Sequence, residues 1–143
     1  MSILTQKTVS KKISLDGIGI HTGVKAHLDI LPANPNSGII FKRVDIEKNN
    51  IIIPTYNNVV DATLCTTISN DYGVKVSTIE HLMGALYGMN IDNAIVELNA
   101  QEVPIMDGSA KKFVESILHV GIHSSEVPIK IIKVEKKIYK ISK

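Results

Sequence analysis

The sequence has 143 residues, of which 44% are hydrophobic and 21% charged, and its formal net charge is +2. This length and composition fit a single soluble globular domain without disulfide staples, and they exclude disordered, collagen-like and fibrous classes. No apolar run approaches the roughly 20 residues that cross a bilayer, and the start of the chain lacks a secretory signal pattern. The one cysteine, Cys65, cannot form an internal disulfide, so we expect a cytoplasmic protein.

The positive charge is concentrated at the C-terminal end. Residues 130–143 hold six lysines and one acid, whereas residues 1–129 carry a net charge of −3. With two phenylalanines and no tryptophan, the body also offers few rings that could stack on bases. We therefore expect no nucleic-acid partner, and the isoleucines that interleave with the tail lysines favour a strand with one solvated face.

The first half of the chain has the pattern of β-structure. Alternating apolar residues and turn signals predict strands at residues 8–15, 24–31, 38–43, 59–69 and 74–76. Residues 44–57 are expected to be irregular. The turn between the first two strands contains Gly17, Gly19 and Gly23, and this density indicates left-handed backbone or the close approach of another segment.

The second half adds two helices and two further strands. The strands are predicted at 93–99 and 102–106, and the second helix is predicted at 109–120. An apolar stripe along that helix, which we expect to pack on the sheet, consists of Phe113, Val114, Ile117 and Leu118. Strands outnumber helices, and hairpin connections dominate.

The first helix is predicted to begin at Ser77 and has an unusual outer face. Its core stripe consists of Ile79, Leu82, Met83 and Leu86, and the opposite face carries Glu80, His81, Gly84 and Ala85. Because that outer face lacks lysine and arginine, we expect a ligand or another domain to cover it.

Glu80 and His81 are the most suggestive pair for chemistry. A neutral imidazole can bind a metal, and an adjacent carboxylate can act as the base for metal-bound water. A structural alternative is a capping box, in which Glu80 returns a hydrogen bond to the backbone of Ser77. A catalytic zinc normally needs three protein ligands, and His21 and His27 are candidates for the others.

Four motifs occur in an order that resembles a known enzyme family. They are Gly17-Ile-Gly-Ile-His-Thr-Gly23, Leu64-Cys-Thr-Thr67, Ser77-Thr-Ile-Glu-His-Leu-Met-Gly-Ala-Leu86 and Pro104-Ile-Met-Asp-Gly-Ser-Ala110. Together they look like the N-terminal domain of the bacterial UDP-3-O-acyl-N-acetylglucosamine deacetylases, zinc amidases of lipid A synthesis in Gram-negative bacteria. The resemblance covers nearly all of residues 3–143.

This resemblance implies an α+β fold, a two-layer sandwich in which two helices lie on one face of a mostly antiparallel sheet of about five strands. It implies that His81 is a zinc ligand, that Glu80 is the general base, and that Leu64, Cys65 and Thr66 line the substrate site. The implied substrate is a UDP-linked acylated amino sugar. Residues 1–125 would form the N-terminal deacetylase domain, and 126–143 a linker and the first strand of a second domain.

The family's remaining zinc ligands, including a His-x-x-x-Asp helix, lie in that second domain, and no such motif occurs here. We therefore expect the C-terminal domain of the same enzyme to be the partner that completes the site. The 143 residues alone are expected to be inactive and to bind zinc weakly. The alternative is a non-catalytic binding module of the same fold whose uncovered helix docks a protein partner.

Overall fold

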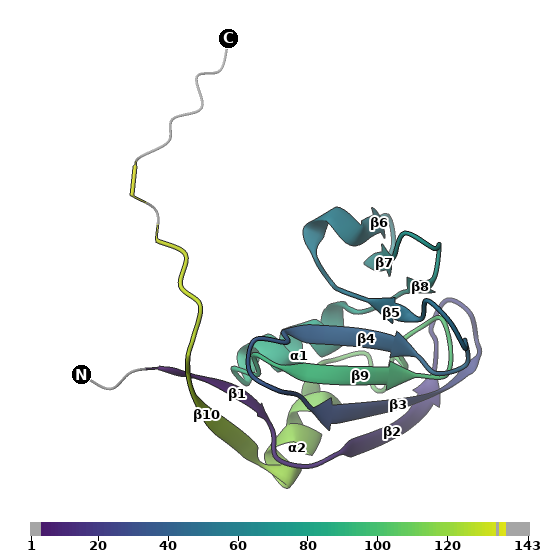
Figure 1. Ribbon diagram of the computed structural model, residues 1–143. Coiled ribbons are helices and arrows are strands. Elements are labelled where there is room, and N and C mark those ends of the chain that lie inside the picture. Colours follow the sequence, from purple (N-terminus) through teal and green to yellow (C-terminus); the bar gives the residue numbers. More distant parts are fainter. Residues whose placement is uncertain (1–3, 134, 137–143) are drawn as a thin grey trace.

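The computed structural model describes residues 4–133 and 135–136 (Figure 1). The helices are α1 (Glu80–Gly88) and α2 (Lys111–Val120), and a short 3-10 turn covers Tyr56–Asn58. The strands are β1 (Thr5–Val9), β2 (Ile13–Ile18), β3 (Lys25–Pro32), β4 (Ile39–Arg43), β5 (Ile51–Ile52), β6 (Val59–Asp61), β7 (Thr67–Ser69), β8 (Lys75–Val76), β9 (Ala94–Leu98) and β10 (Ile122–Pro128).

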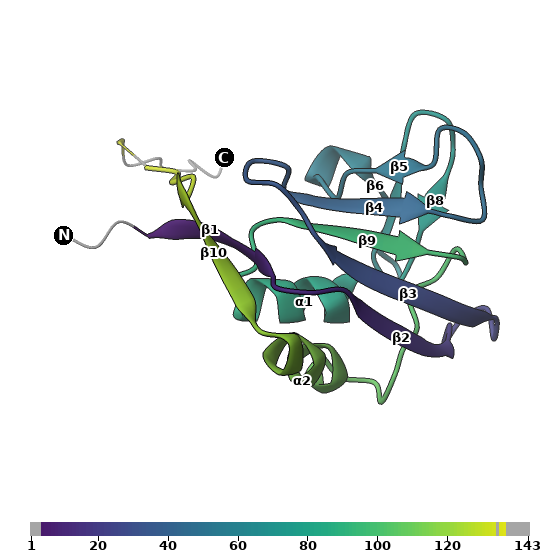
Figure 2. The ribbon, with the colours of Figure 1, turned by 60° about the horizontal axis from the view of Figure 1, so that its bottom comes forward.

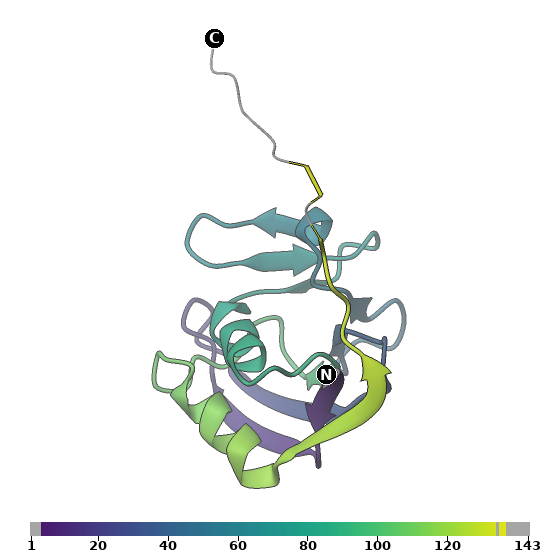
Figure 3. The ribbon, with the colours of Figure 1, turned by 90° about the vertical axis from the view of Figure 1, so that its left-hand side faces the viewer.

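A five-stranded sheet with the order β2-β3-β9-β4-β5 forms one layer, and α1 and α2 form the other (Figure 2). All neighbouring strands in this sheet are antiparallel except β4 and β9, which run parallel. Both helices lie on the same face of the sheet (Figure 3). The predicted α+β sandwich is therefore confirmed.

Two smaller sheets complete the described part of the chain. Strands β6, β7 and β8 form a three-stranded antiparallel sheet beyond β5, and β1 pairs with β10 at the opposite end (Figure 1). Arg43 at the end of β4 is almost buried and donates a hydrogen bond of 2.8 Å to the carbonyl oxygen of Lys75 in β8. This bond fastens the three-stranded sheet to the main one.

The hydrophobic core lies between the main sheet and the helices. In the central strand β9, Ala94, Val96 and Leu98 are buried and alternate with partly exposed residues, as expected for a strand with one covered face. Val96 lies opposite Ile30 of β3 and Phe41 of β4, so the inward residues of three strands meet. The helices close this core from the other side with Leu82, Leu86, Phe113 and Ile117.

Two predicted strands are each divided in the structure. Residues 8–15 contribute to β1 and β2, which separate at Ser10 because β1 pairs with β10 whereas β2 pairs with β3. Residues 59–69 fold back on themselves as β6 and β7. Periodicity alone cannot reveal such breaks, because both halves of each stretch are β-structure.

Three further differences concern the edges of the fold. Residues 44–57, expected to be irregular, contain the short strand β5, and β10 forms where no strand is predicted, because residues 122–128 lack a run of large apolar residues. Residues 102–106 form no strand, only a single bridge between Glu102 and Ser77. In the basic tail, residues 130–133 and 135–136 are not strand, and 134 and 137–143 lie outside the described residues.

Helix α2 packs on the sheet as predicted, but through a narrower stripe. Phe113 and Ile117 are fully buried, whereas Leu118 is 62% exposed. The C-cap is Gly121, whose φ of 85° places it in the left-handed region that favours glycine. Among the described residues, neither helix is long and apolar enough to span a membrane.

The different burial of Phe113 and Leu118 in α2 predicts different losses of stability when each is replaced by alanine. Phe113→Ala should lower the free energy of unfolding by about 3–5 kcal/mol, because it leaves a cavity between α2 and the sheet. Leu118→Ala should change it by no more than about 0.5 kcal/mol, since that side chain is exposed. Urea unfolding followed by circular dichroism measures both, and similar losses in the two variants would contradict this assignment of the helix faces.

Candidate functional site

Helix α1 does not begin with the expected capping box. The helix starts at Glu80 with Ile79 as its N-cap, and no side chain caps it. The backbone N–H of Ser77 instead donates to the carbonyl oxygen of Gln101 at 2.9 Å. The capping-box prediction for Glu80 is therefore wrong, because the chain before Ile79 turns away to pair with another segment.

The Glu80 carboxylate points to a different segment. Its Oε2 accepts a hydrogen bond of 3.1 Å from the backbone N–H of Thr66, just before β7. Glu80 and His81 both remain partly exposed at the first turn of α1. The tertiary structure thus brings two of the motifs together, one from the helix and one from the small sheet.

The other two residues predicted to line the substrate site, Leu64 and Cys65, are accessible. Leu64 is 82% exposed, and Cys65 is partly exposed rather than buried as a small hydrophobic residue. The Cys65 Sγ lies 3.8 Å from Thr67 Oγ1. Leu64 and Cys65 therefore present apolar and polarizable surface beside the start of α1.

The outer face of α1 differs in part from the expectation. Ala85 is buried in the core, so its assignment to the outer face is wrong. Gly84 is exposed, as predicted, and Tyr87 is 86% exposed one turn further along. The helix therefore displays small residues and one aromatic ring, in line with a face that another molecule or domain covers.

The glycine-rich turn has both properties that its glycine density predicts. Gly23 has a φ of 67°, in the left-handed region. A Cβ atom on Gly17 would lie 2.7 Å from the Pro104 side chain, and one on Gly19 would overlap the carboxylate of Glu102. The turn therefore lies directly against Glu102 and against Pro104, the first residue of the fourth motif.

The carboxylate of Glu102 is the centre of this packing, since Glu102 is only 1% exposed. Its Oε1 accepts hydrogen bonds from the backbone N–H of His21 at 3.1 Å and from Thr78 Oγ1 at 2.8 Å. Its Oε2 accepts bonds from the backbone N–H of Thr22 at 2.9 Å and from Thr22 Oγ1 at 2.7 Å. Burial raises the pKa of Glu102, but these bonds outweigh it and hold the pKa below its usual value.

Thr78 has an unusual backbone conformation. Its φ is 58°, which is rare for a β-branched residue, and its side chain is buried. Such a conformation costs about 1–3 kcal/mol and persists only where the surroundings determine it. The hydrogen bond from Thr78 Oγ1 to Glu102 is one of the contacts that hold this conformation. Thr78 lies two residues before Glu80 in the sequence.

A cavity of about 680 Å³ opens between the glycine-rich turn and the small sheet. Its walls come from the glycine-rich turn, from the segment that connects β6 to β7, and from the bridged segments around Ser77 and Glu102. The lining residues include His21, Asp61, Leu64, Cys65 and Glu102. Two of the three predicted substrate residues, Leu64 and Cys65, thus line it. Glu80, His81 and Thr66 do not.

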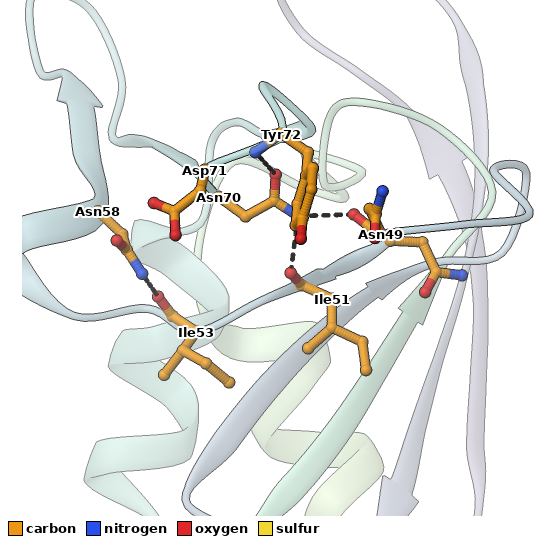
Figure 4. A pocket seen from close by; sticks show the side chains of 8 residues that line it. Asn49, Ile51, Ile53, Asn58, Asn70, Asp71 and Tyr72 are labelled. Carbon is orange, nitrogen blue, oxygen red and sulfur yellow. Dashed lines mark hydrogen bonds between the residues drawn. The ribbon is translucent and has the colours of Figure 1, made fainter.

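A second cavity, of about 510 Å³, lies between β5 and the β7–β8 turn and is lined by asparagines and Tyr72 (Figure 4). The side-chain amides of Asn50, Asn58 and Asn70 are engaged within the protein. Asn70 Nδ2 donates to the carbonyl oxygens of Asn49 and Ile51, and Asn70 Oδ1 accepts from the backbone N–H of Tyr72 (Figure 4). We therefore interpret this cavity as part of the attachment of the small sheet rather than a ligand site.

The described residues do not contain a complete metal centre. Among them, no group of three or more His, Cys, Asp and Glu side chains could hold an ion. His27 Nδ1 lies 2.8 Å from Asp16 Oδ1, and its Nε2 lies 3.3 Å from Asp29 Oδ1. Because these carboxylates engage both ring nitrogens, His27 is unsuited to be a ligand. His81 directly follows Glu80 in the first turn of α1.

The fold and the four adjoining motifs define a domain of a known enzyme class. The chain belongs to the family described as UDP-3-O-acyl N-acetylglycosamine deacetylase, whose family model matches residues 6–142. The expected resemblance is thereby confirmed.

Individual relatives carry the same name. The chain is 47% identical over 136 residues to the UDP-3-O-acyl-N-acetylglucosamine deacetylase of Teredinibacter turnerae, an alignment that covers 95% of this chain and 45% of that protein. It is 42% identical to the enzyme of the same name from Shewanella baltica, with 95% of this chain and 44% of that protein covered. The chain thus spans somewhat less than half the length of these relatives.

The acidic surroundings of His27 predict a pH effect on stability. The hydrogen bond to Asp16, and the charges of Asp16 and Asp29, raise the pKa of His27 above 6.5. A raised pKa in the folded state means that protonated His27 stabilises the fold below about pH 6.5, and that this contribution disappears as the pH rises through the folded pKa.

The difference in unfolding free energy between wild type and His27→Gln should therefore be larger at about pH 6 than at about pH 8. Urea unfolding of both proteins across this range measures it. His123→Gln, a substitution at an exposed position in β10, serves as the matched control. A difference that grows with pH would contradict the assignment.

Proposed function

We propose that this chain is the N-terminal half of a zinc-dependent deacetylase that removes the N-acetyl group from UDP-3-O-acyl-N-acetylglucosamine. The names of the relatives support the reaction. The observation that carries the assignment to residues is the Glu80 carboxylate, which is free of helix capping and held by Thr66 at the partly exposed start of α1.

Glu80 would act as the general base. Its one hydrogen bond, from the backbone N–H of Thr66, orients the side chain and leaves carboxylate lone pairs free to accept a proton from water. The oxygen of that water then bonds to the N-acetyl carbonyl carbon. The C–N bond breaks as the amine nitrogen gains a proton, and acetate and the free amine result.

His81 would contribute one imidazole ligand to the zinc ion. His81 is partly exposed at the first turn of α1, so its ring is accessible to a metal ion. Zinc, when bound, supplies Lewis-acid polarisation of the carbonyl and lowers the pKa of water. His81 meets the requirement for one donor, and a catalytic zinc site needs about three protein ligands.

The remaining ligands would come from the C-terminal domain of the same enzyme. The relatives are more than twice as long as the segment that this chain matches. The exposed Gly84 and Tyr87 face of α1 offers a surface that such a domain could cover. Leu64, Cys65 and Thr66 would form the wall of the shared substrate site, on the side of the acylated amino sugar.

The proposal predicts separate defects for the two site residues in the native gene product that contains this chain. Glu80→Gln should retain zinc and lower kcat by about 100-fold or more, because it removes the base and keeps the shape. His81→Ala should lose zinc, measured by elemental analysis after dialysis. Glu97→Gln in β9, where the carboxylate bonds to Lys42, and His123→Ala, at an exposed position in β10, are the matched controls.

Full turnover in Glu80→Gln together with full zinc content in His81→Ala would overturn the proposal. That pair of results would favour the alternative, a non-catalytic module that docks a protein partner through the exposed face of α1.

The isolated 143-residue polypeptide should show no measurable deacetylation and only weak zinc binding, because its described residues contain no group of three or more side chains that could hold a metal ion. Equilibrium dialysis against zinc, with a chelator of known affinity as competitor, measures the binding. Tight zinc binding with one ion per chain would contradict the proposed division of the ligands between two domains.

A further inference from the structure

Glu102 joins two segments that are distant in the sequence. One is the glycine-rich turn, which provides the donors of His21 and Thr22, and the other is Thr78, directly before α1. The bond to Thr22 spans 80 positions in the sequence and the bond to Thr78 spans 24. A single buried carboxylate thus sets the position of the turn relative to the start of the helix.

The geometry of the turn is adapted to this carboxylate. A Cβ atom at Gly19 would overlap Glu102, so the turn can approach the carboxylate only because residue 19 is glycine. The consecutive N–H groups of His21 and Thr22 then point at its two oxygens, an arrangement that binds anions. Because Glu102 is buried, these donors replace the water that it loses.

The bond to Thr78 acts on the helix through the backbone. Thr78 holds a φ of 58°, and this value decides the direction in which the chain enters α1. Ile79 and Glu80 follow immediately, and the first helical bond of α1 runs from the Met83 N–H to the Ile79 carbonyl oxygen at 2.9 Å. A change in φ at Thr78 would therefore rotate Glu80 and His81 relative to Thr66 and the rest of the site.

We propose that Glu102 is a positioning residue: through its hydrogen bond to Thr78 it holds the strained backbone that sets the positions of Glu80 and His81 at the start of α1. This inference rests on the proposed roles of Glu80 and His81. Glu102 itself contacts neither of them in the structure, and its hydrogen-bonding partners are the donors of the turn and Thr78.

The first test uses Glu102→Gln in the native gene product. The amide nitrogen of glutamine would face two donors where a carboxylate oxygen accepts two bonds, so the bridge between the turn and Thr78 is weakened. We expect kcat to fall by about 10- to 100-fold with KM within about threefold of wild type, because small displacements of reacting groups have such effects. Glu97→Gln is the matched control and should keep kcat within about twofold.

A second pair of variants separates positioning from general stability. Thr78→Val removes only the hydroxyl and keeps a β-branched residue at a positive φ, whereas Thr78→Gly removes both the hydroxyl and the strain. We expect Thr78→Val to lose activity as Glu102→Gln does, and Thr78→Gly to retain more of it. The double variant Glu102→Gln with Thr78→Gly should recover part of the kcat lost in Glu102→Gln.

Amide hydrogen exchange supplies a readout that does not depend on turnover. The Met83 amide should exchange faster in Glu102→Gln and in Thr78→Val than in wild type, and it should exchange at the wild-type rate in Glu97→Gln. If Glu80→Gln proves fully active, the proposed function fails, and the Met83 exchange rate still tests whether Glu102 holds the start of α1.

The proposal is overturned if Met83 exchange is unchanged in both Glu102→Gln and Thr78→Val. It is also overturned if Thr78→Val matches wild type in kcat, or if Thr78→Gly recovers no activity in the double variant. If Glu102→Gln does not fold, the comparison of Thr78→Val with Thr78→Gly decides, because both keep the carboxylate and its bonds to the turn.

Discussion

The buried carboxylate of Glu102 is the interaction on which the arrangement of the glycine-rich turn and the start of α1 depends. A charge that is 1% exposed must be compensated, and Glu102 is compensated by hydrogen bonds from amide and hydroxyl groups of two segments. Because Gly19 and Thr78 adopt their positions against this carboxylate, the glycine-rich turn and the start of α1 form one unit. The five-stranded sheet beneath them supplies the rigid support.

The three-stranded sheet of β6, β7 and β8 brings Thr66 to the start of α1, where it contacts Glu80. Arg43 and Asn70 fasten β7 and β8 to β4 and β5, and the chain just before β7 then reaches the helix, where Thr66 donates to Glu80. The Glu80 carboxylate is thus oriented by backbone from a separate sheet. This arrangement suits a base that must keep its lone pairs available, since a capping role would have directed them to the helix.

Much of the fold could be predicted from the sequence because its signals are local. Strands β3, β4 and β9 and helix α2 follow apolar periodicity and turn residues closely. The glycine density of residues 17–23 predicts left-handed backbone or a close approach, and both occur. The predictions that are wrong concern segments whose structure depends on the distant segment with which they pair. The capping box at Ser77 is wrong because its N–H bonds to Gln101, and the single stretch 8–15 divides because its halves join different sheets.

The sequence by itself indicated the family of this protein through the resemblance that its four ordered motifs carry, and the excess of strands over helices agreed with the fold that this resemblance implies. It also determined the candidate pair Glu80 and His81. Only the tertiary structure decided that Glu80 accepts from Thr66 and that Glu102 joins the turn to Thr78. The physical reason is distance along the chain: hydrogen bonds that span 14 to 81 positions leave no periodic trace in the sequence.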